Sequence, residues 1–182
     1  HIFWDNAADF SPIAYNSFNE WMIDTLRTII KIPTVNWLIK IHPAEVWWGD
    51  ANRGAKFLIT QNFPNLPDNI KIVPPDAKIN PLEFYHSIDG GITSCGTVGM
   101  ELSMLGKPVI IAGRPHYSGK GFTYDGFEPV EYRKLLENAE NISCLNEEKV
   151  LLAKKYAYCY FIRKQIPLSI TLNKDPKTWV GY

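Results

Sequence analysis

Three short stretches of the sequence place hydroxyl, basic and acidic side chains where they could form hydrogen bonds to an anionic ligand. The first contains Lys40 and His42 at the end of the apolar run 37–41. A strand there would put both side chains on one face, and both can donate hydrogen bonds to phosphate oxygens. The alternative is that Lys40 reaches solvent and His42 caps a local turn, and the pair taken alone favours this alternative.

The second stretch, residues 93–101 (TSCGTVGME), is a glycine-rich turn that leads into a predicted helix. Gly96 lets backbone approach a ligand closely, and the amides at a helix N-terminus favour phosphate. Ser94 and Thr97 add hydroxyl donors, and Glu101, one turn after Thr97, can accept two ribose hydroxyls. The pattern is neither a Walker A loop nor GxGxxG. The alternative is a plain helix with Ser94 or Thr97 as its N-cap.

The third stretch is the long loop 113–125 (GRPHYSGKGFTYD), which follows a predicted buried strand. A loop of this length is usually functional or disordered. Its hydrogen-bond donors are Arg114, His116, Tyr117, Ser118, Lys120 and Thr123. Such donors suit recognition of a phosphate-linked sugar. The alternative is a solvated loop in which Tyr117 and Phe122 fold back onto the core.

Other reactive residues point to structural roles. Cys95 has no evident partner for nucleophilic chemistry and is expected to be a small buried residue. His86 lies at the end of a predicted helix, where a cation complements the helix dipole. The sequence has no DXD-type metal site, and its 3 cysteines are far apart, which argues against a zinc site or a disulfide scaffold and fits a reducing cytoplasm.

The elements expected to position these residues alternate between strand and helix. The predicted strands are 2–4, 36–41, 70–73, 88–93 and 108–112. The predicted helices are 18–31, 50–61, 81–85, 97–105, 128–139 and 146–163, and the tail after Pro167 is expected to be irregular. Ser17 with Glu20 forms a capping box, Asn80 caps a helix, and Gly106 stops one. The alternation predicts an α/β, Rossmann-like three-layer domain with a mostly parallel sheet, whose ligand binds at the carboxyl ends of the strands.

Length and charge narrow the function classes. The 182 residues form one domain or two very small ones, and 19 basic residues balance 19 acidic ones, so nothing indicates electrostatic binding of nucleic acid. No apolar run approaches the length of a membrane-spanning helix. The chain begins at His1 within an apolar segment, and we expect it to be a piece of a longer protein.

Together these stretches resemble the bacterial capsule polysaccharide biosynthesis family, which includes Kdo-transferring enzymes. The resemblance covers most of the chain. The matching motifs, in order, are residues 37–43 (WLIKIHP), 93–101 (TSCGTVGME), 105–109 (LGKPV) and 117–125 (YSGKGFTYD), and the aromatic and basic helix 154–164 (KKYAYCYFIRK) is similar. The resemblance implies the C-terminal, donor-binding half of a GT-B glycosyltransferase, with residues 1–182 as one nucleotide-sugar-binding domain.

The resemblance also implies roles for individual residues. His42 would bind the donor phosphate, with Lys40 beside it. The residues that would hold the phosphate and ribose are Thr93, Ser94, Gly96, Thr97 and Glu101. The residues expected near the sugar are Arg114, Tyr117 and Thr123. The donor would be a CMP- or UDP-linked sugar, with a lean toward cytidine, and no metal ion or other cofactor is expected.

The resemblance covers only one half of a GT-B enzyme, and this limits the activity expected of the chain. A GT-B enzyme has its active site between two Rossmann-like domains, and the acceptor-binding half is absent here. The catalytic residues are therefore not assigned. This chain alone is expected to transfer no sugar. The parent enzyme is expected in the cytoplasm, in peripheral contact with the membrane because capsule acceptors are lipid-linked, although no strongly basic amphipathic helix is evident from the sequence. The alternatives are a relative of UDP-GlcNAc 2-epimerase, a polyol-phosphate transferase, and a non-catalytic nucleotide-sugar-binding module.

Overall fold

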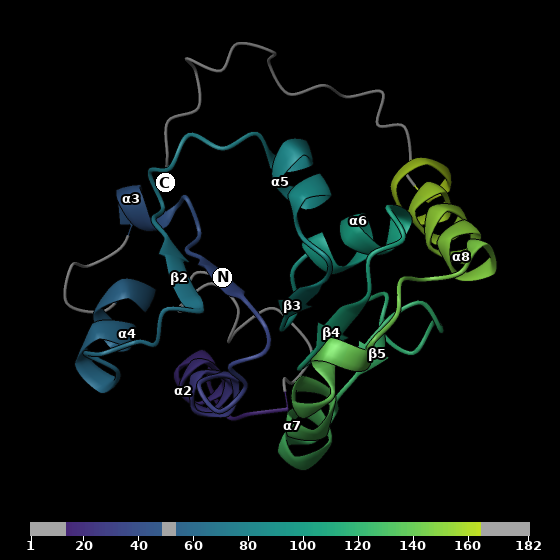
Figure 1. The fold of residues 1–182 in the computed structure, drawn as a ribbon. Helices are drawn as coiled ribbons and strands as arrows, with labels where there is room; N and C mark the ends of the chain where they lie inside the picture. Colours follow the sequence, from purple (N-terminus) through teal and green to yellow (C-terminus); the bar gives the residue numbers. More distant parts are fainter. Residues whose placement is uncertain (1–13, 49–53, 165–182) are drawn as a thin grey trace, which may run out of the picture.

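Helices and parallel strands alternate along the chain in a computed structural model, which describes residues 14–48 and 54–164 (Figure 1). The predicted strand 2–4 and the tail after Pro167 lie outside the described residues. The strands are β1 (Trp37–Lys40), β2 (Ile70–Val73), β3 (Gly91–Thr93), β4 (Val109–Ile111) and β5 (Tyr124–Asp125). The helices are α2 (Phe18–Ile29), α3 (Glu45–Trp48), α4 (Ala55–Asn62), α5 (Pro81–Ser87), α6 (Val98–Met104), α7 (Pro129–Glu137) and α8 (Glu147–Tyr158), with a 3-10 turn η1 (Ala139–Asn141) and a π-helical turn η2 (Cys159–Arg163).

The strands form two parallel sheets among the described residues, rather than the one sheet that the sequence predicts. β1 pairs with β2, with Trp37 opposite Ile70, and the second sheet has the order β3-β4-β5, with Gly91 opposite Val109. Figure 1 shows β1 and β2 beside α2, α3 and α4, and β3, β4 and β5 beside α6, α7 and α8. The molecule is a small α/β, Rossmann-like domain, and every strand pair in the described part is parallel.

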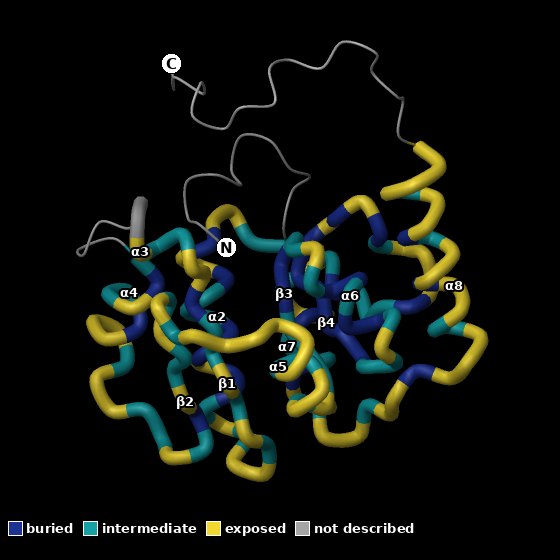
Figure 2. The backbone as a smooth tube through the Cα atoms, turned by 90° about the horizontal axis from the view of Figure 1, so that it is seen from above, coloured by how far each residue is buried: buried dark blue, intermediate teal, exposed yellow. Residues whose placement is uncertain are grey.

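One of two hydrophobic core clusters joins the two sheets. It combines Ile70 of β2 and Ile110 of β4 with the buried face of α2, including Leu26, which is 1% exposed. Burying a leucine to this extent contributes about 1.5–3 kcal/mol relative to leaving it exposed. Figure 2 shows the buried backbone concentrated in the interior and the exposed residues on loops and outer helices. A second cluster, containing Met100 and Phe122, packs between β4, α6 and α8.

The start of α2 follows the predicted capping box with one difference. Ser17 is the N-cap, and its Oγ accepts a 3.2 Å hydrogen bond from the Glu20 amide. The Glu20 carboxylate, however, accepts from the Asn16 amide at 3.1 Å rather than from the Ser17 amide. Both bonds satisfy amide groups that have no partner inside the helix, so they stabilise the helix start.

The remaining elements correct several predicted boundaries. Gly54, expected inside a helix over 50–61, is instead the N-cap of α4. The strand predicted over 88–93 is confined to Gly91–Thr93, and Ile88 is instead the C-cap of α5. The helix predicted over 146–163 changes at Cys159 from α to π geometry. The residues 124–125, expected to be part of a loop, form the edge strand β5.

Candidate functional site

The carboxyl ends of the parallel strands carry most of the residues that the sequence singled out. Lys40 is the last residue of β1, and Thr93 is the last residue of β3. Arg114 follows three residues after the end of β4, and Asp125 ends β5. The ends of β3, β4 and β5 belong to one sheet and lie on a common edge, which is where open α/β sheets bind ligands, whereas Lys40 ends a strand of the other sheet.

The end of β1 is held by hydrogen bonds to its own backbone. The Lys40 ammonium donates to the carbonyl of Ile41 at 2.9 Å and to that of Pro74, just beyond β2, at 3.3 Å. His42 is exposed, and its Nδ1 accepts from the Ala44 amide at 3.1 Å. A neutral imidazole that accepts at Nδ1 carries its proton on Nε2. The His42 bond matches the turn cap of the structural alternative, whereas Lys40 binds two backbone carbonyls instead of only reaching solvent.

The turn between β3 and α6 buries its first residues and exposes its last. Thr93 is 4% exposed, and its hydroxyl accepts a 3.2 Å hydrogen bond from the Gly96 amide. Ser94 has no exposed surface, and its hydroxyl lies 3.5 Å from the thiol of Cys95. Thr97 is exposed and occupies the N-cap position, with no capping bond from its side chain. Of the two predicted caps, Thr97 is therefore correct in position, and Ser94 is wrong.

Tyr117 reaches this turn from the loop after β4. The residue has no exposed surface, and its hydroxyl donates to the carbonyl of Gly96. Gly99 in α6 makes room for it, because a Cβ at Gly99 would overlap the tyrosine hydroxyl and lie 2.9 Å from Cζ. Burial raises the pKa of Tyr117 above its ordinary value. The sequence analysis expected Tyr117 near a bound sugar. In the structure it is buried instead, and its hydroxyl holds the backbone of the turn at Gly96 from the interior of the domain.

Glu101 is partly exposed one helical turn after Thr97, as the sequence predicts. Its Oε2 accepts a 2.9 Å hydrogen bond from the hydroxyl of Tyr85 on α5. Burial and this bond to the carboxylate raise the pKa of Tyr85 to about 12. A carboxylate has about four acceptor positions, so Glu101 can accept from a ligand hydroxyl while Tyr85 fixes its orientation. Sequence reasoning missed Tyr85, because it belongs to a separate helix and no spacing rule connects the two.

The loop 113–125 is closed by Asp125. Its carboxylate accepts from the Thr123 hydroxyl at 2.6 Å and from the Gly119 amide at 2.5 Å. Gly119 has φ +68°, a left-handed conformation that glycine adopts without strain. Phe122 is fully buried, as the structural alternative for this loop expects. Thr123 is half-buried, and the sequence identified it as a binding residue without foreseeing that its partner would be Asp125.

Arg114 provides a fixed cation at the same edge. Its guanidinium carbon lies 4.3 Å from the ring centroid of Phe127, which follows β5. The side chain of Glu131 accepts from the Phe127 amide at 3.2 Å, so the ring is itself held at the start of α7. Stacking on an aromatic ring leaves the edges of a guanidinium able to bind an anion in a bidentate manner. Arg114 forms no salt bridge with any other residue in the part of the chain that the structure describes.

The hydrogen bond from Tyr117 to Gly96 connects the loop 113–125 to the turn 93–97. The bonds described for Lys40, in contrast, stay at the ends of β1 and β2. The predicted site residues with a surface that a ligand could touch are Lys40, His42, Gly96, Thr97, Glu101, Arg114 and Thr123. Thr93, Ser94 and Tyr117 lie beneath that surface. Within residues 14–48 and 54–164, no three or more His, Cys, Asp or Glu side chains gather as a metal ion would require.

Comparison with known proteins assigns the chain to a family. The family model described as capsule polysaccharide biosynthesis protein matches residues 11–159, which include all three predicted stretches and every strand of the structure. No curated protein and no solved structure matches the chain. None of the described helices is long and apolar enough to cross a membrane. Because the family model matches well over half of its residues, this chain belongs to the capsule polysaccharide biosynthesis protein family.

Proposed function

We propose that this domain binds the nucleotide-sugar donor of a glycosyltransferase that acts in the synthesis of capsule or other surface polysaccharide. Membership of the capsule polysaccharide biosynthesis family supports a role in surface polysaccharide synthesis. The nucleotide-sugar assignment rests on one observation above all. Glu101, oriented by Tyr85, lies one helical turn beyond the exposed glycine-rich turn at the carboxyl edge of β3.

The proposed binding mode divides the donor among these groups. The Glu101 carboxylate accepts hydrogen bonds from the ribose hydroxyls, as acidic residues do in dinucleotide-binding folds. The exposed hydroxyl of Thr97, the Nε2–H of His42 and the guanidinium of Arg114 bind phosphate oxygens. Thr93, Ser94 and Tyr117 have a different role from the one first expected, because they support the turn from inside.

We assign no catalytic base or acid among the described residues at this edge. A second domain of the parent protein would supply the acceptor site and the catalytic base or acid, and it would bring a glycan or lipid-linked acceptor to the donor. We propose that the parent works in the cytoplasm, at the inner face of the cytoplasmic membrane. The donor nucleotide is proposed to be cytidine- or uridine-linked.

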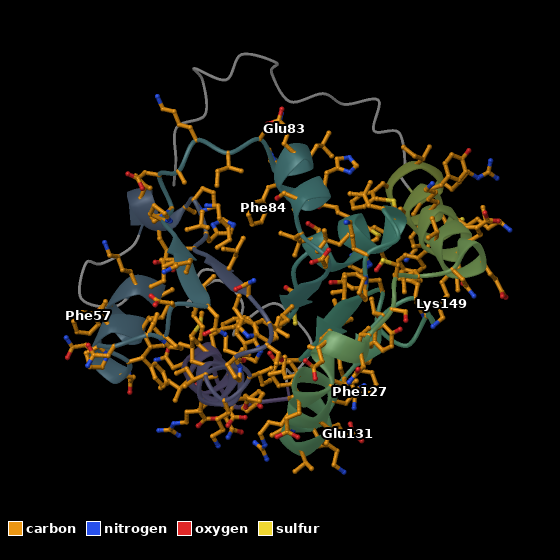
Figure 3. The ribbon with its side chains drawn as sticks, viewed as in Figure 1. Phe57, Glu83, Phe84, Phe127, Glu131 and Lys149 are labelled. Atoms are coloured by element: carbon orange, nitrogen blue, oxygen red, sulfur yellow. The ribbon has the colours of Figure 1, made fainter. Side chains whose placement is uncertain are left out.

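Calorimetric titration tests the proposal directly. The ligands are cytidine, CMP, CDP, UMP, UDP and GDP. Glu101→Gln should weaken nucleosides and nucleotides alike, by about tenfold to a hundredfold, which corresponds to the 1.5–3 kcal/mol of a charge-assisted hydrogen bond. His42→Ala should weaken nucleotides and leave cytidine unchanged. Glu83→Gln is the matched control, because Glu83 projects from α5 away from the other elements (Figure 3).

Two results would contradict the proposal. One is that the folded wild-type chain binds none of the nucleotides at millimolar concentration. The other is that Glu101→Gln and Glu83→Gln bind them equally well, which would mean that the Glu101 carboxylate does not contact the ribose. An equal loss of cytidine and nucleotide affinity in His42→Ala would remove the phosphate assignment for that residue alone.

A further inference from the structure

Helix α8 buries two alanines completely or nearly so, while several of its large apolar residues are exposed. Ala153 has no exposed surface and Ala157 is 8% exposed, and both belong to the core cluster between β4, α6 and α8. By contrast, Leu151 is 52% exposed and Tyr158 is 54% exposed. Leu151 and Tyr158 are seven residues apart, which places them on one face of an α-helix. Val150 and Tyr156 also pack against this cluster, so the core takes one face of α8 and leaves Leu151 and Tyr158 available to another surface.

The apolar surface continues past the end of α8 into η2. Phe161 is 41% exposed and Ile162 is 62% exposed. We call the four side chains Leu151, Tyr158, Phe161 and Ile162 the outer apolar stripe. Figure 1 shows α8 at the opposite side of the molecule from α4, and Figure 2 shows its outer turns in the colour of exposed residues.

Basic residues predominate along this stripe from Lys149 onward, after an acidic first turn of α8 that contains Glu147 and Glu148. The segment 149–164 contains five Lys or Arg residues and no Asp or Glu, although the whole chain has no net charge. Lys154 and Lys155 lie three and four residues after Leu151, on the same face of the helix, and both are exposed. Arg163 and Lys164 are exposed beside Ile162. The sequence alone did not suggest a basic amphipathic helix here, because apolar residues lie on both the buried and the exposed faces of α8.

The stripe is presented on a rigid support. The ring of His116, in the loop after β4, stacks on Tyr160 of η2 with 3.9 Å between ring centroids and 3° between their planes. The Tyr156 hydroxyl donates a 2.6 Å hydrogen bond to the carbonyl of His116. The last turns are therefore fixed to the body of the domain, and the exposed apolar residues do not belong to a loose chain end.

We infer that the outer face of α8 and η2 docks on an anionic lipid membrane surface. Large apolar side chains flanked by lysines and arginines are what an in-plane helix uses, with the apolar groups at the boundary of the acyl chains and the cations among anionic headgroups. A symmetric contact between two copies centred on Ile162 would bring Arg163 and Lys164 of both copies together, which disfavours a dimer through this end of the face. Nucleic acid offers phosphates but no apolar layer to cover Ile162 and Leu151.

Vesicle cosedimentation of the whole 182-residue chain tests this inference, with phosphatidylcholine vesicles compared with vesicles that also contain phosphatidylglycerol. We expect binding to the anionic vesicles, with weaker binding at higher salt. Lys154→Gln with Lys155→Gln should lower the partition coefficient about thirtyfold, the equivalent of about 1 kcal/mol for each basic residue near an anionic surface. Ile162→Ser should also lower it, with less dependence on salt.

The matched control is Lys31→Gln with Lys134→Gln, which removes the same charge from exposed positions on other elements. Thermal melting checks that each variant is folded. The inference is overturned if folded wild-type chain does not bind anionic vesicles, or if the control pair reduces binding as much as the α8 pair. It is also overturned if light scattering shows a dimer that Ile162→Glu dissociates. Nucleotide affinity is a separate measurement, so none of these results depends on the proposed donor site.

Discussion

The hydroxyl of Tyr85 on α5 donates a 2.9 Å hydrogen bond to Oε2 of Glu101 on α6. The bond connects two helices that lie on either side of β3 in the chain. Burial and the neighbouring carboxylate raise the pKa of Tyr85 to about 12, so the phenol keeps its proton at every physiological pH. Tyr85 is thus a permanent donor that holds the Glu101 carboxylate in one orientation.

Replacing Tyr85 with Phe should weaken binding of both nucleosides and nucleotides at the proposed site. The expected loss is about five- to tenfold, the value of about one neutral hydrogen bond, because a freely rotating carboxylate must be ordered by the ligand instead. Titration calorimetry measures it, and Tyr158→Phe is the matched control because its ring is exposed on α8. Unchanged affinity in Tyr85→Phe, with wild-type protein that does bind nucleotides, would show that Tyr85 does not position Glu101.

Replacing Gly99 with Ala should destabilise the domain. Alanine is favoured over glycine by up to about 1 kcal/mol within a helix. Against this, the new Cβ would overlap the Tyr117 hydroxyl and lie 2.9 Å from its Cζ, and overpacking of this kind costs about 1–3 kcal/mol. The clash should prevail, because Tyr117 is fully buried and cannot swing into solvent.

Urea unfolding of the single and double variants measures this effect. Tyr117→Phe in the Gly99→Ala background removes the overlapping hydroxyl, so it should cost less stability there than in the wild-type background. A Gly99→Ala variant at least as stable as wild type would mean that Tyr117 shifts without cost.

Local signals allowed much of the fold to be predicted from the sequence. Asn80 caps α5 as expected, because its side chain accepts the 2.9 Å hydrogen bond from the Leu82 amide that the residue type suggests. Gly106 has φ +81°, the conformation in which a glycine ends a helix. Helix caps and helix ends depend on residues only a few positions away, so they can be predicted from the sequence alone.

What the sequence could not predict depends on contacts between distant residues. Tyr124 and Asp125 form a strand only because β4 is beside them, and two residues give no periodic pattern. The exclusion of Ser94 and Tyr117 from the ligand-facing surface follows from packing between α6 and the loop after β4. Residue types indicated the right segments, but they could not distinguish a side chain that touches a ligand from one that supports the backbone beneath it.

Replacing Asp125 with Asn should open the loop 113–125. An asparagine cannot accept from both the Gly119 amide and the Thr123 hydroxyl with two oxygens, as the carboxylate does. Exposed Lys120 then becomes a site for trypsin, and cleavage there should be faster than in wild type. Asp68→Asn is the control, because Asp68 is an exposed residue whose carboxylate contacts Lys71 at 3.7 Å. Equal cleavage rates at Lys120 in all three proteins would show that Asp125 does not hold the loop closed.

His116 should make the stability of the domain depend on pH below about 6.5. Burial against its aromatic neighbours, followed by the positive charge of Lys164, lowers the pKa of His116 from 6.5. Although the residue lies at the surface, Tyr160 covers one face of its ring. The folded state therefore favours neutral imidazole. Its contribution to stability is complete above the unfolded pKa, and it is lost as the pH falls through the folded one.

The free energy of unfolding should accordingly decrease on acidification from pH 6.5, before most carboxylates begin to titrate near pH 4. His116→Phe retains a ring for stacking on Tyr160 but removes the titrating group, so its stability should change less over the same range. Lys164→Gln should move the pKa of His116 back toward 6.5, because one of the two causes of the shift is removed. Chemical denaturation at several pH values measures the first effect, and NMR titration of the His116 ring measures the second. A ring pKa at or above 6.5 in the wild-type protein would refute this prediction, because the stacked ring would then favour the charged form.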